Sequence, residues 1–193
     1  MTSSNEFITI VSGLPRSGTS MMMRMLEAGG MQPLKDDIRE ADESNPRGYY
    51  EYEGAKKIRE DSSWLGKASG KAVKIVSRLL YDLPGEKHYK VIFMRRSMDE
   101  ILSSQRQMIE RLGEERREKM DDSGMAALFH AHLAHLTGWL AHRPNVDVLE
   151  VDYNQLLADP HPILQRVNTF LGHTLDTGKM AMVIDPSLYR ERR

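Results

Sequence analysis

The sequence of 193 residues has no cysteine, no long apolar run and almost no net charge. Without cysteine, the chain has neither a disulfide framework nor a thiolate metal site, and a reducing compartment is the simpler expectation. No apolar run approaches the ~20 residues that a membrane-spanning helix needs. Lys and Arg number 27 against 28 Asp and Glu. This balance argues against a general attraction to nucleic acid, so an anion site has to be local.

The beginning of the chain and its length set two further expectations. Residues 1–7 are polar and lack the basic and then apolar layout of a secretory signal, which predicts a cytoplasmic protein. The length suits one domain with a substantial core. No repeat, low-complexity tract or linker divides the sequence, so we expect a single domain over residues 1–193.

The order of apolar runs and amphipathic stretches predicts an α/β fold. Short apolar runs followed by turn residues indicate strands, and apolar residues at helical spacing indicate helices. The predicted strands are residues 7–11, 72–76, 90–94 and 146–151. The predicted helices are residues 18–28, 50–65, 97–112, 125–141 and 162–171, with a long loop over 31–48. This alternation favours a three-layer α/β/α architecture with a largely parallel central sheet.

An anion-binding loop is predicted between the first strand and the first helix. GLPRSGTS, residues 13–20, has the glycine spacing of the phosphate-binding pattern G-x-x-x-x-G-K-[ST], but Thr19 stands where that pattern has lysine. Backbone N–H groups at the start of the following helix attract anions. Arg16 can add a forked, bidentate contact, and Ser17, Thr19 and Ser20 can donate hydroxyls. The alternative is an ordinary glycine-containing turn.

The missing lysine argues against a nucleotide site that depends on Mg²⁺. Nucleotide-hydrolysing loops place that lysine on the β- and γ-phosphates and a Ser or Thr on Mg²⁺. The predicted strand 90–94 runs into Arg95 and Arg96 instead of an acidic residue, and only the strand 146–151 ends in an acid, Asp152. The sequence therefore predicts an anion held by arginine and backbone groups, without a metal.

A second basic site is predicted at the end of the strand 90–94. Arg95 and Arg96 follow that strand, and Ser104 lies eight residues after Arg96 on the next predicted helix. Ligands of open α/β sheets bind at the carboxyl ends of the strands, where the first loop also lies. Two separate anion sites at one edge suggest a ligand with two anionic groups.

Four segments together resemble the sulfotransferases that use 3′-phosphoadenosine 5′-phosphosulfate (PAPS) as donor, particularly the bacterial-type members. LPRSGTS, from Leu14, is similar to their 5′-phosphosulfate loop, and RRSMDEILSS, from Arg95, is similar to their 3′-phosphate motif. NPRGYYE, from Asn45, resembles a segment common in the bacterial members. VDYNQLLADPHPILQRVNTFLG, from Val151, resembles a stretch near their C-terminus. The four segments occur in the family's order and span nearly the whole chain.

The resemblance implies a P-loop-like α/β/α fold and metal-independent, in-line transfer of a sulfuryl group from PAPS to a hydroxyl or an amine. The residues that it places on the donor are Arg16, Ser17, Gly18, Thr19 and Ser20 at the 5′-phosphosulfate, and Arg96 and Ser104 at the 3′-phosphate. With the helix N-terminus, Arg16 and Lys74 would stabilise the transition state and the departing 5′-phosphate.

The general base is where the sequence departs from the family. Cytosolic members carry a histidine shortly after the strand lysine, but Val76 occupies that place after Lys74. Other branches use a glutamate, which makes Glu51 the candidate for removing the acceptor proton and Glu53 the second choice. The alternative for Glu51 is a surface carboxylate near a helix start.

The family's C-terminal Arg-Lys-Gly loop, which grips the 3′-phosphate, has no equivalent here. The tail ends in YRERR, so Arg190, Arg192 or Arg193 could substitute, with a solvated tail as the alternative.

Other side chains could serve the acceptor. Tyr49, Tyr50 and Trp64 offer rings for a cleft, although ordinary packing explains them as well. Four histidines, at positions 130, 132, 135 and 142, crowd one predicted helix. No cysteine or acid-rich motif accompanies them, so a metal site is not expected and a place in or near the acceptor pocket remains open.

Two other functions remain open beside the sulfotransferase. A P-loop kinase would require ATP and Mg²⁺, and a non-catalytic nucleotide-binding or scaffold protein would retain ligand binding without turnover. The expected partner is a small-molecule or carrier-bound acceptor and not nucleic acid. None of the motifs specifies the acceptor or the oligomeric state.

Overall fold

The computed structural model describes residues 7–36, 38, 48–111 and 121–184, and its centre is a five-stranded sheet in the order β2-β3-β1-β4-β5. All four strand pairs are parallel. The strands are β1 (Phe7–Gly13), β2 (Pro33–Leu34), β3 (Ala72–Lys74), β4 (His88–Arg95) and β5 (Val146–Asp152). The central strands β1 and β4 are buried along most of their length and largely apolar because both faces of the sheet are covered.

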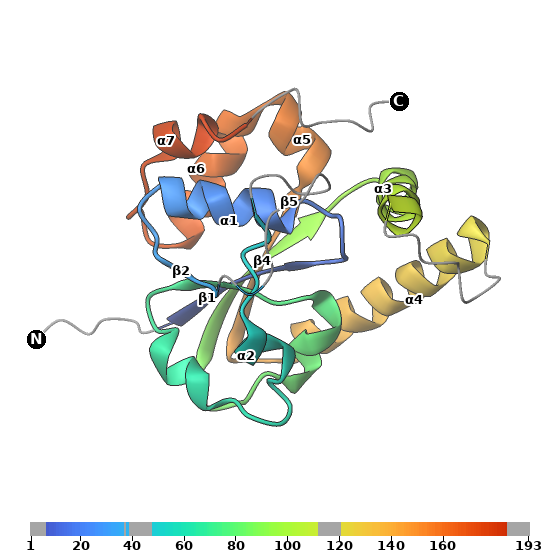
Figure 1. Ribbon diagram of the computed structural model, residues 1–193. Coiled ribbons are helices and arrows are strands. Elements are labelled where there is room, and N and C mark those ends of the chain that lie inside the picture. Colours follow the sequence, from blue (N-terminus) through green and yellow to red (C-terminus); the bar gives the residue numbers. More distant parts are fainter. Residues whose placement is uncertain (1–6, 37, 39–47, 112–120, 185–193) are drawn as a thin grey trace, which may run out of the picture.

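Helices cover both faces of the sheet, and the predicted three-layer α/β/α class with a parallel central sheet is confirmed (Figure 1). One layer holds α1 (Thr19–Ala28), α5 (Tyr153–Ala158), α6 (Pro160–Phe170) and α7 (Thr177–Ala181). The other holds α2 (Glu53–Lys56), the 3-10 helices η1 (Ser63–Lys67) and η2 (Ser77–Asp82), and part of α4 (Asp122–Ala141). The remaining helix is α3 (Met98–Arg111).

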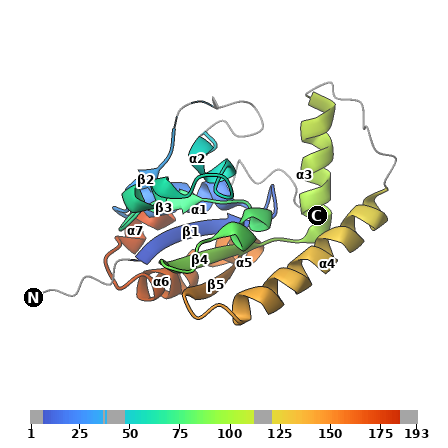
Figure 2. The ribbon, with the colours of Figure 1, turned by 90° about the horizontal axis from the view of Figure 1, so that it is seen from below.

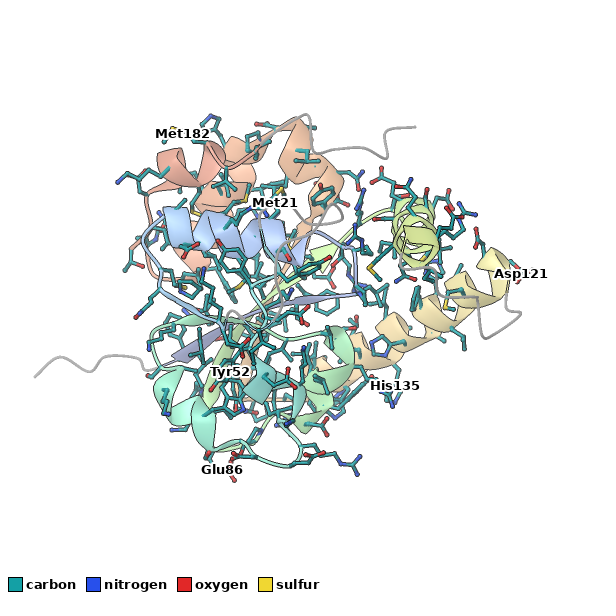
Figure 3. The ribbon with its side chains drawn as sticks, viewed as in Figure 1. Met21, Tyr52, Glu86, Asp121, His135 and Met182 are labelled. Carbon is teal, nitrogen blue, oxygen red and sulfur yellow. The ribbon has the colours of Figure 1, made fainter. Side chains whose placement is uncertain are left out.

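Each face of the sheet has its own hydrophobic core. On the α1 side, Met22, Met23 and Leu164 are fully buried, so the first helix contributes methionines to packing. On the other side, Trp64 packs edge-on against Tyr52, with 5.3 Å between the ring centroids. Figure 3 shows Met21 and Tyr52 on opposite sides of the sheet.

Two helices extend away from the sheet at its carboxyl edge. Figure 2 shows α3 and α4 running outward at an angle to each other, and the two helices are in contact. An ion pair between Arg106 and Asp122 joins them, and the Asp121 side chain caps α4 by accepting from the Gly124 N–H at 2.8 Å. Within the described part of the chain, no helix combines the length and apolar character needed to cross a membrane.

The predicted helix over residues 50–65 is wrong. The segment forms only the four-residue α2, and the second short helix, η1, begins at Ser63. The Asp61 side chain accepts a hydrogen bond from the Ser63 N–H at 2.8 Å, a local turn that competes with helix continuation.

Several predicted boundaries also shift. The strand over 72–76 ends at Lys74, and the helix over 162–171 begins at Pro160, where a proline suits the first turn. The short elements β2, α5, α7 and η2 were not predicted. Residues 37 and 39–47 of the predicted loop over 31–48, and residues 112–120 between α3 and α4, lie outside the described residues.

A polar seam attaches α4 to η2. The ring nitrogen Nε2 of His132 and the hydroxyl of Ser77 lie 2.9 Å apart, and Nδ1 of His135 lies 2.9 Å from the Tyr81 hydroxyl. Burial lowers the pKa of His132, and the nearby positive charges of His135 and Arg78 add to that effect. The seam therefore favours a neutral His132.

Gly18 allows α5 to pack against the beginning of α1. A Cβ atom at this position would lie 2.3 Å from Cδ2 of the Tyr153 ring, and the φ angle of +96° already lies in the left-handed region. Gly30 has a similar φ angle of +105°, but no atom within 4 Å of its position for a Cβ. A comparison of Gly18 with Gly30 therefore separates the cost of backbone strain from the cost of steric overlap.

We expect acidification to destabilise the wild-type protein through His132. The unfolded chain takes up this proton near pH 6.5, whereas the folded chain takes it up only at lower pH. The contribution of neutral His132 to the free energy of unfolding is therefore complete above pH 6.5. It is lost as the pH falls from there through the lowered pKa of the folded state. Urea unfolding of H132Q between pH 5 and pH 8 should show a weaker pH dependence than the wild type. The same substitution at exposed His130 is the control, and an equal change in both variants would contradict the assignment.

Gly18→Ala should destabilise the fold more than Gly30→Ala. The left-handed backbone alone costs about 1–2 kcal/mol with a Cβ atom, so G30A should lose about that much. G18A should lose a further ~1–3 kcal/mol from overlap with the Tyr153 ring. Urea denaturation of the two variants measures the difference, and equal losses would show that the ring moves aside without cost.

Candidate functional site

The predicted anion loop joins β1 to α1 with its backbone held in unusual conformations. Gly13 and Gly18 have positive φ angles, and so does Arg16, at 73°. A Cβ atom on Gly13 would lie 2.5 Å from the Ser17 hydroxyl and 2.7 Å from the Met94 carbonyl oxygen, so only glycine fits. No side chain among the described residues caps the beginning of α1, which leaves its first turn suited to an anion.

The hydroxyl of Ser17 points into this loop without a protein partner. Ser17 is 1% exposed, and its Oγ accepts or donates no hydrogen bond within the described residues. A buried hydroxyl without a partner is unfavourable unless a ligand or water satisfies it. The loop therefore fits an anion with oxygen atoms.

Lys74 supplies a cation close to the place where the loop lacks its lysine. It ends β3, where it stands in register with Val11 of β1. Its Nζ donates to the Ser20 hydroxyl at 3.4 Å and to the Tyr49 carbonyl oxygen. The Ser20 hydroxyl in turn donates to the same carbonyl at 3.2 Å. The first helix, β3 and the segment around Tyr49 thus meet at one ammonium group.

Glu51 lies beside this ammonium group. One carboxylate oxygen is 3.9 Å from Lys74 Nζ, and the other is 2.9 Å from Lys56 Nζ. Lys56 also pairs with Glu53 at 3.1 Å. The hydrogen bond to Glu51 is the main cause of the raised pKa of Lys56. The Glu51 side chain is 17% exposed and the Glu53 side chain is 40% exposed. Of the two candidate bases, Glu51 is thus the one beside Lys74 and the loop.

The segment that carries Glu51 is tied down on both sides. The Asp36 N–H donates to the Glu51 carbonyl at 2.9 Å, and the Asp36 carboxylate accepts from the Glu53 N–H at 2.6 Å. Tyr50 has a φ angle of 55° and donates from its hydroxyl to Glu27. Burial is the main cause of the raised pKa of Tyr50, with this hydrogen bond second. These contacts hold Glu51 in place without a ligand.

The second basic site adjoins the loop. Arg16 Nε donates to the Ser104 hydroxyl at 2.8 Å, although the two residues are 88 positions apart. Arg96 Nη1 donates to the backbone carbonyl of Arg16 at 2.9 Å. The two motifs are therefore in direct contact at the carboxyl ends of β1 and β4.

Arg96 is held by residues that the sequence interpretation missed. Its Nε donates to Glu100 at 2.7 Å, and its guanidinium lies 4.7 Å from the ring centroid of Tyr153. Asn154 donates to the other Glu100 oxygen at 2.8 Å. Burial raises the pKa of Tyr153, although the nearby Arg96 opposes the shift, so the phenol is neutral at physiological pH. The four-residue spacing from Arg96 to Glu100 was the one signal available in the sequence.

Other predicted participants lie elsewhere. Trp64 is buried against Tyr52 in the core, and the histidines of α4 include His132 and His135 in the seam with η2. Val76, in the position of the family histidine, is 43% exposed. The C-terminal arginines lie outside the described residues. Over the ranges that the structure describes, no group of three or more His, Asp or Glu side chains could hold a metal ion.

Comparison with known proteins identifies a family for this fold and site. Residues 52–177, almost two thirds of the chain, match the sulfotransferase family. The match includes Lys74, Arg96 and Ser104 and begins just after Glu51. No curated protein matches the sequence.

Among solved structures, the chain is similar to an unliganded sugar kinase from Janibacter sp. HTCC2649, with 14% sequence identity and a TM-score of 0.44 over 93% of this chain and 99% of that one. A likeness this distant says nothing about the substrate. The match over residues 52–177 is what assigns the chain, and the protein belongs to the sulfotransferase family.

Proposed function

We propose that this protein transfers a sulfuryl group from PAPS to a hydroxyl or an amine of a small or carrier-bound acceptor, without a metal ion. The main support for the proposal is the 2.8 Å hydrogen bond from Arg16 to the Ser104 hydroxyl. It joins the anion loop to the second basic motif, and a donor nucleotide with anionic groups at both its 5′ and 3′ ends matches two adjoining basic motifs. The family supports sulfuryl transfer as the reaction.

The residues present fit this donor. The uncapped start of α1 and the buried Ser17 hydroxyl suit the 5′-phosphosulfate, with Thr19 and Ser20 beside them. Arg96 and Ser104 suit the 3′-phosphate, because a guanidinium and a hydroxyl both donate to phosphate oxygens. Gly13 keeps the loop clear of a side chain that would occupy the same space.

Charge neutralisation is the role proposed for Lys74 and Arg16. The donor supplies a sulfur atom that bonds to the acceptor oxygen or nitrogen as its bond to the 5′-phosphate oxygen breaks. Lys74 contacts the loop by donating a hydrogen bond to the Ser20 hydroxyl, and Arg16 belongs to the loop itself. Both can stabilise negative charge on the sulfuryl oxygens and on the departing phosphate.

Glu51 is the proposed base. Its carboxylate lies 3.9 Å from Lys74 Nζ, which places a proton acceptor next to the cation at the loop. The acceptor proton passes to this carboxylate as the new bond to sulfur forms, and adenosine 3′,5′-bisphosphate leaves with the electron pair of the broken bond. Glu53 is more exposed and pairs only with Lys56 among the ion pairs seen here, which makes it the weaker candidate.

The acids of the site do not favour Mg²⁺ chemistry. β4 ends in Arg95 and continues into Arg96, and β5 ends in Asp152. The Asp152 side chain accepts from the Gln155 N–H at 2.8 Å and so caps α5. The strand that ends in an acid is therefore separated from β1 by β4, and its carboxylate is already used at a helix start.

Adenosine 3′,5′-bisphosphate should stabilise the protein against heat. At 100 times its dissociation constant, a ligand adds about 2.7 kcal/mol to the folded state, which for a chain of this size is a rise of about 5–11 °C in Tm. Thermal unfolding with the bisphosphate, with ATP and Mg²⁺, and without ligand measures this rise. The Arg96→Ala variant should lose most of it.

A rise in Tm with ATP and Mg²⁺ alone would contradict the donor assignment and favour a kinase. A rise with the bisphosphate, but no turnover with a panel of hydroxyl and amine acceptors, would favour the non-catalytic alternative.

Glu51→Gln should lower kcat by about 10²–10⁴-fold while the bisphosphate still binds, because removal of a general base affects the chemical step. Glu53→Gln removes the same charge two residues away and should retain most of the activity. Steady-state kinetics of the two variants, with bisphosphate binding measured in parallel, distinguish the roles. A larger loss in E53Q than in E51Q would assign the base to Glu53.

A further inference from the structure

We propose that Glu100 and Asn154 clamp the guanidinium of Arg96 in one orientation and thereby set the preference of the site for a nucleotide that carries a 3′-phosphate. The inference rests on the proposed function, because the 3′-phosphate belongs to its donor. It concerns Glu100, which contacts Arg96, and Asn154, which contacts Glu100. Neither has an assigned contact with the ligand, so both are positioning residues.

The clamp is a buried ion pair with a second anchor. The side chains of Arg96 and Glu100 are 9% and 11% exposed, and Arg96 Nε donates to Glu100 Oε2 at 2.7 Å. Asn154, at the beginning of α5, donates from Nδ2 to Glu100 Oε1 at 2.8 Å. Both carboxylate oxygens are thus engaged, one by α5 and the other by the arginine.

Two further contacts fix the plane of the guanidinium. Nη1 of Arg96 donates to the backbone carbonyl of Arg16 at 2.9 Å, and Tyr153 lies against its face at 4.7 Å. The N–H donors of a guanidinium form a rigid fork, so bonds at Nε and Nη1 determine where the whole fork points. Arg96 is therefore oriented before a ligand arrives.

Pre-orientation affects only ligands that use Arg96. An arginine already held in its binding geometry loses little rotamer freedom when a phosphate binds. Without the Glu100 carboxylate, the side chain has to be ordered by the ligand itself. The affinity for a nucleotide with a 3′-phosphate therefore falls, and the affinity for one without it does not. General damage to the fold would lower both affinities.

The test compares adenosine 3′,5′-bisphosphate with adenosine 5′-monophosphate by isothermal titration calorimetry. Glu100→Gln keeps the size of the side chain, but its amide nitrogen has to face one of the two donors. The affinity for the bisphosphate should fall about tenfold, and the affinity for the monophosphate should change less than about twofold. Asp99→Asn is the matched control, because it removes the same charge from an exposed neighbour on α3 and should leave both affinities unchanged.

Two more variants keep the test decisive if E100Q folds poorly. Asn154→Ala removes the second anchor and should shift the affinity ratio in the same direction. In an Arg96→Ala background, E100Q should have no further effect on the ratio, because its effect passes through the arginine.

The two proposals fail in different ways. If the wild type prefers the bisphosphate but E100Q and N154A keep that preference, the clamp is wrong and the donor assignment stands. If the wild type does not distinguish the two nucleotides, the donor assignment itself is wrong, and the clamp with it.

Discussion

The site depends on holding three cations close together at one edge of a parallel sheet. Parallel pairing places the carboxyl ends of β1, β3 and β4 side by side, and each contributes one cation there or just beyond: Arg16, Lys74 and Arg96. Like charges repel, so each cation needs a nearby acceptor when no ligand is bound. The acceptors are the Ser104 hydroxyl, the Tyr49 carbonyl and the Glu100 carboxylate. Lys74 also lies 3.9 Å from the Glu51 carboxylate, so Lys74 and Arg96 each have a carboxylate nearby, whereas the contact of Arg16 with Ser104 is with a neutral hydroxyl.

The ion pairs of Glu51 and Glu100 differ in how deeply they are buried. Glu51 is partly exposed and shared between Lys74 and Lys56, whereas Glu100 is buried and paired with Arg96. A buried pair is strongly fixed, because separating it leaves an uncompensated charge in a low-dielectric environment. A pair at the surface is screened and rearranges easily. The Arg96 end of the site is accordingly rigid. At the Lys74 end, Asp36 holds the backbone of Glu51 in place, while the carboxylate of Glu51 is shared between two lysines.

The structure brings most of the predicted site residues together, because these residues lie in local motifs or at strand ends. The loop at residues 13–20, Lys74 after its apolar run, and the Arg96–Ser104 spacing all follow from a parallel sheet whose ligands gather at one edge. Tyr153 and the Tyr49 carbonyl were missed because their contacts depend on packing between segments far apart in the chain. The helix over residues 50–65 was wrong because a local turn at Asp61 outweighed helical spacing. Elements as short as β2 carry too few residues to show a period.

The lysine at the loop, Lys74, comes from β3 and not from the loop itself, so the arrangement of the site depends on several strands of the fold. A loop that carries its own lysine is complete once one strand, one turn and one helix have formed. Here the Lys74 contact to Ser20 spans 54 positions and the Arg16 contact to Ser104 spans 88. Contacts between such distant positions carry a cost in loop-closure entropy and exist only once the strands have paired. The arrangement of Arg16, Ser20 and Lys74 therefore depends on β3 and β4 having docked on either side of β1, and residues 7–28 alone contain only part of it.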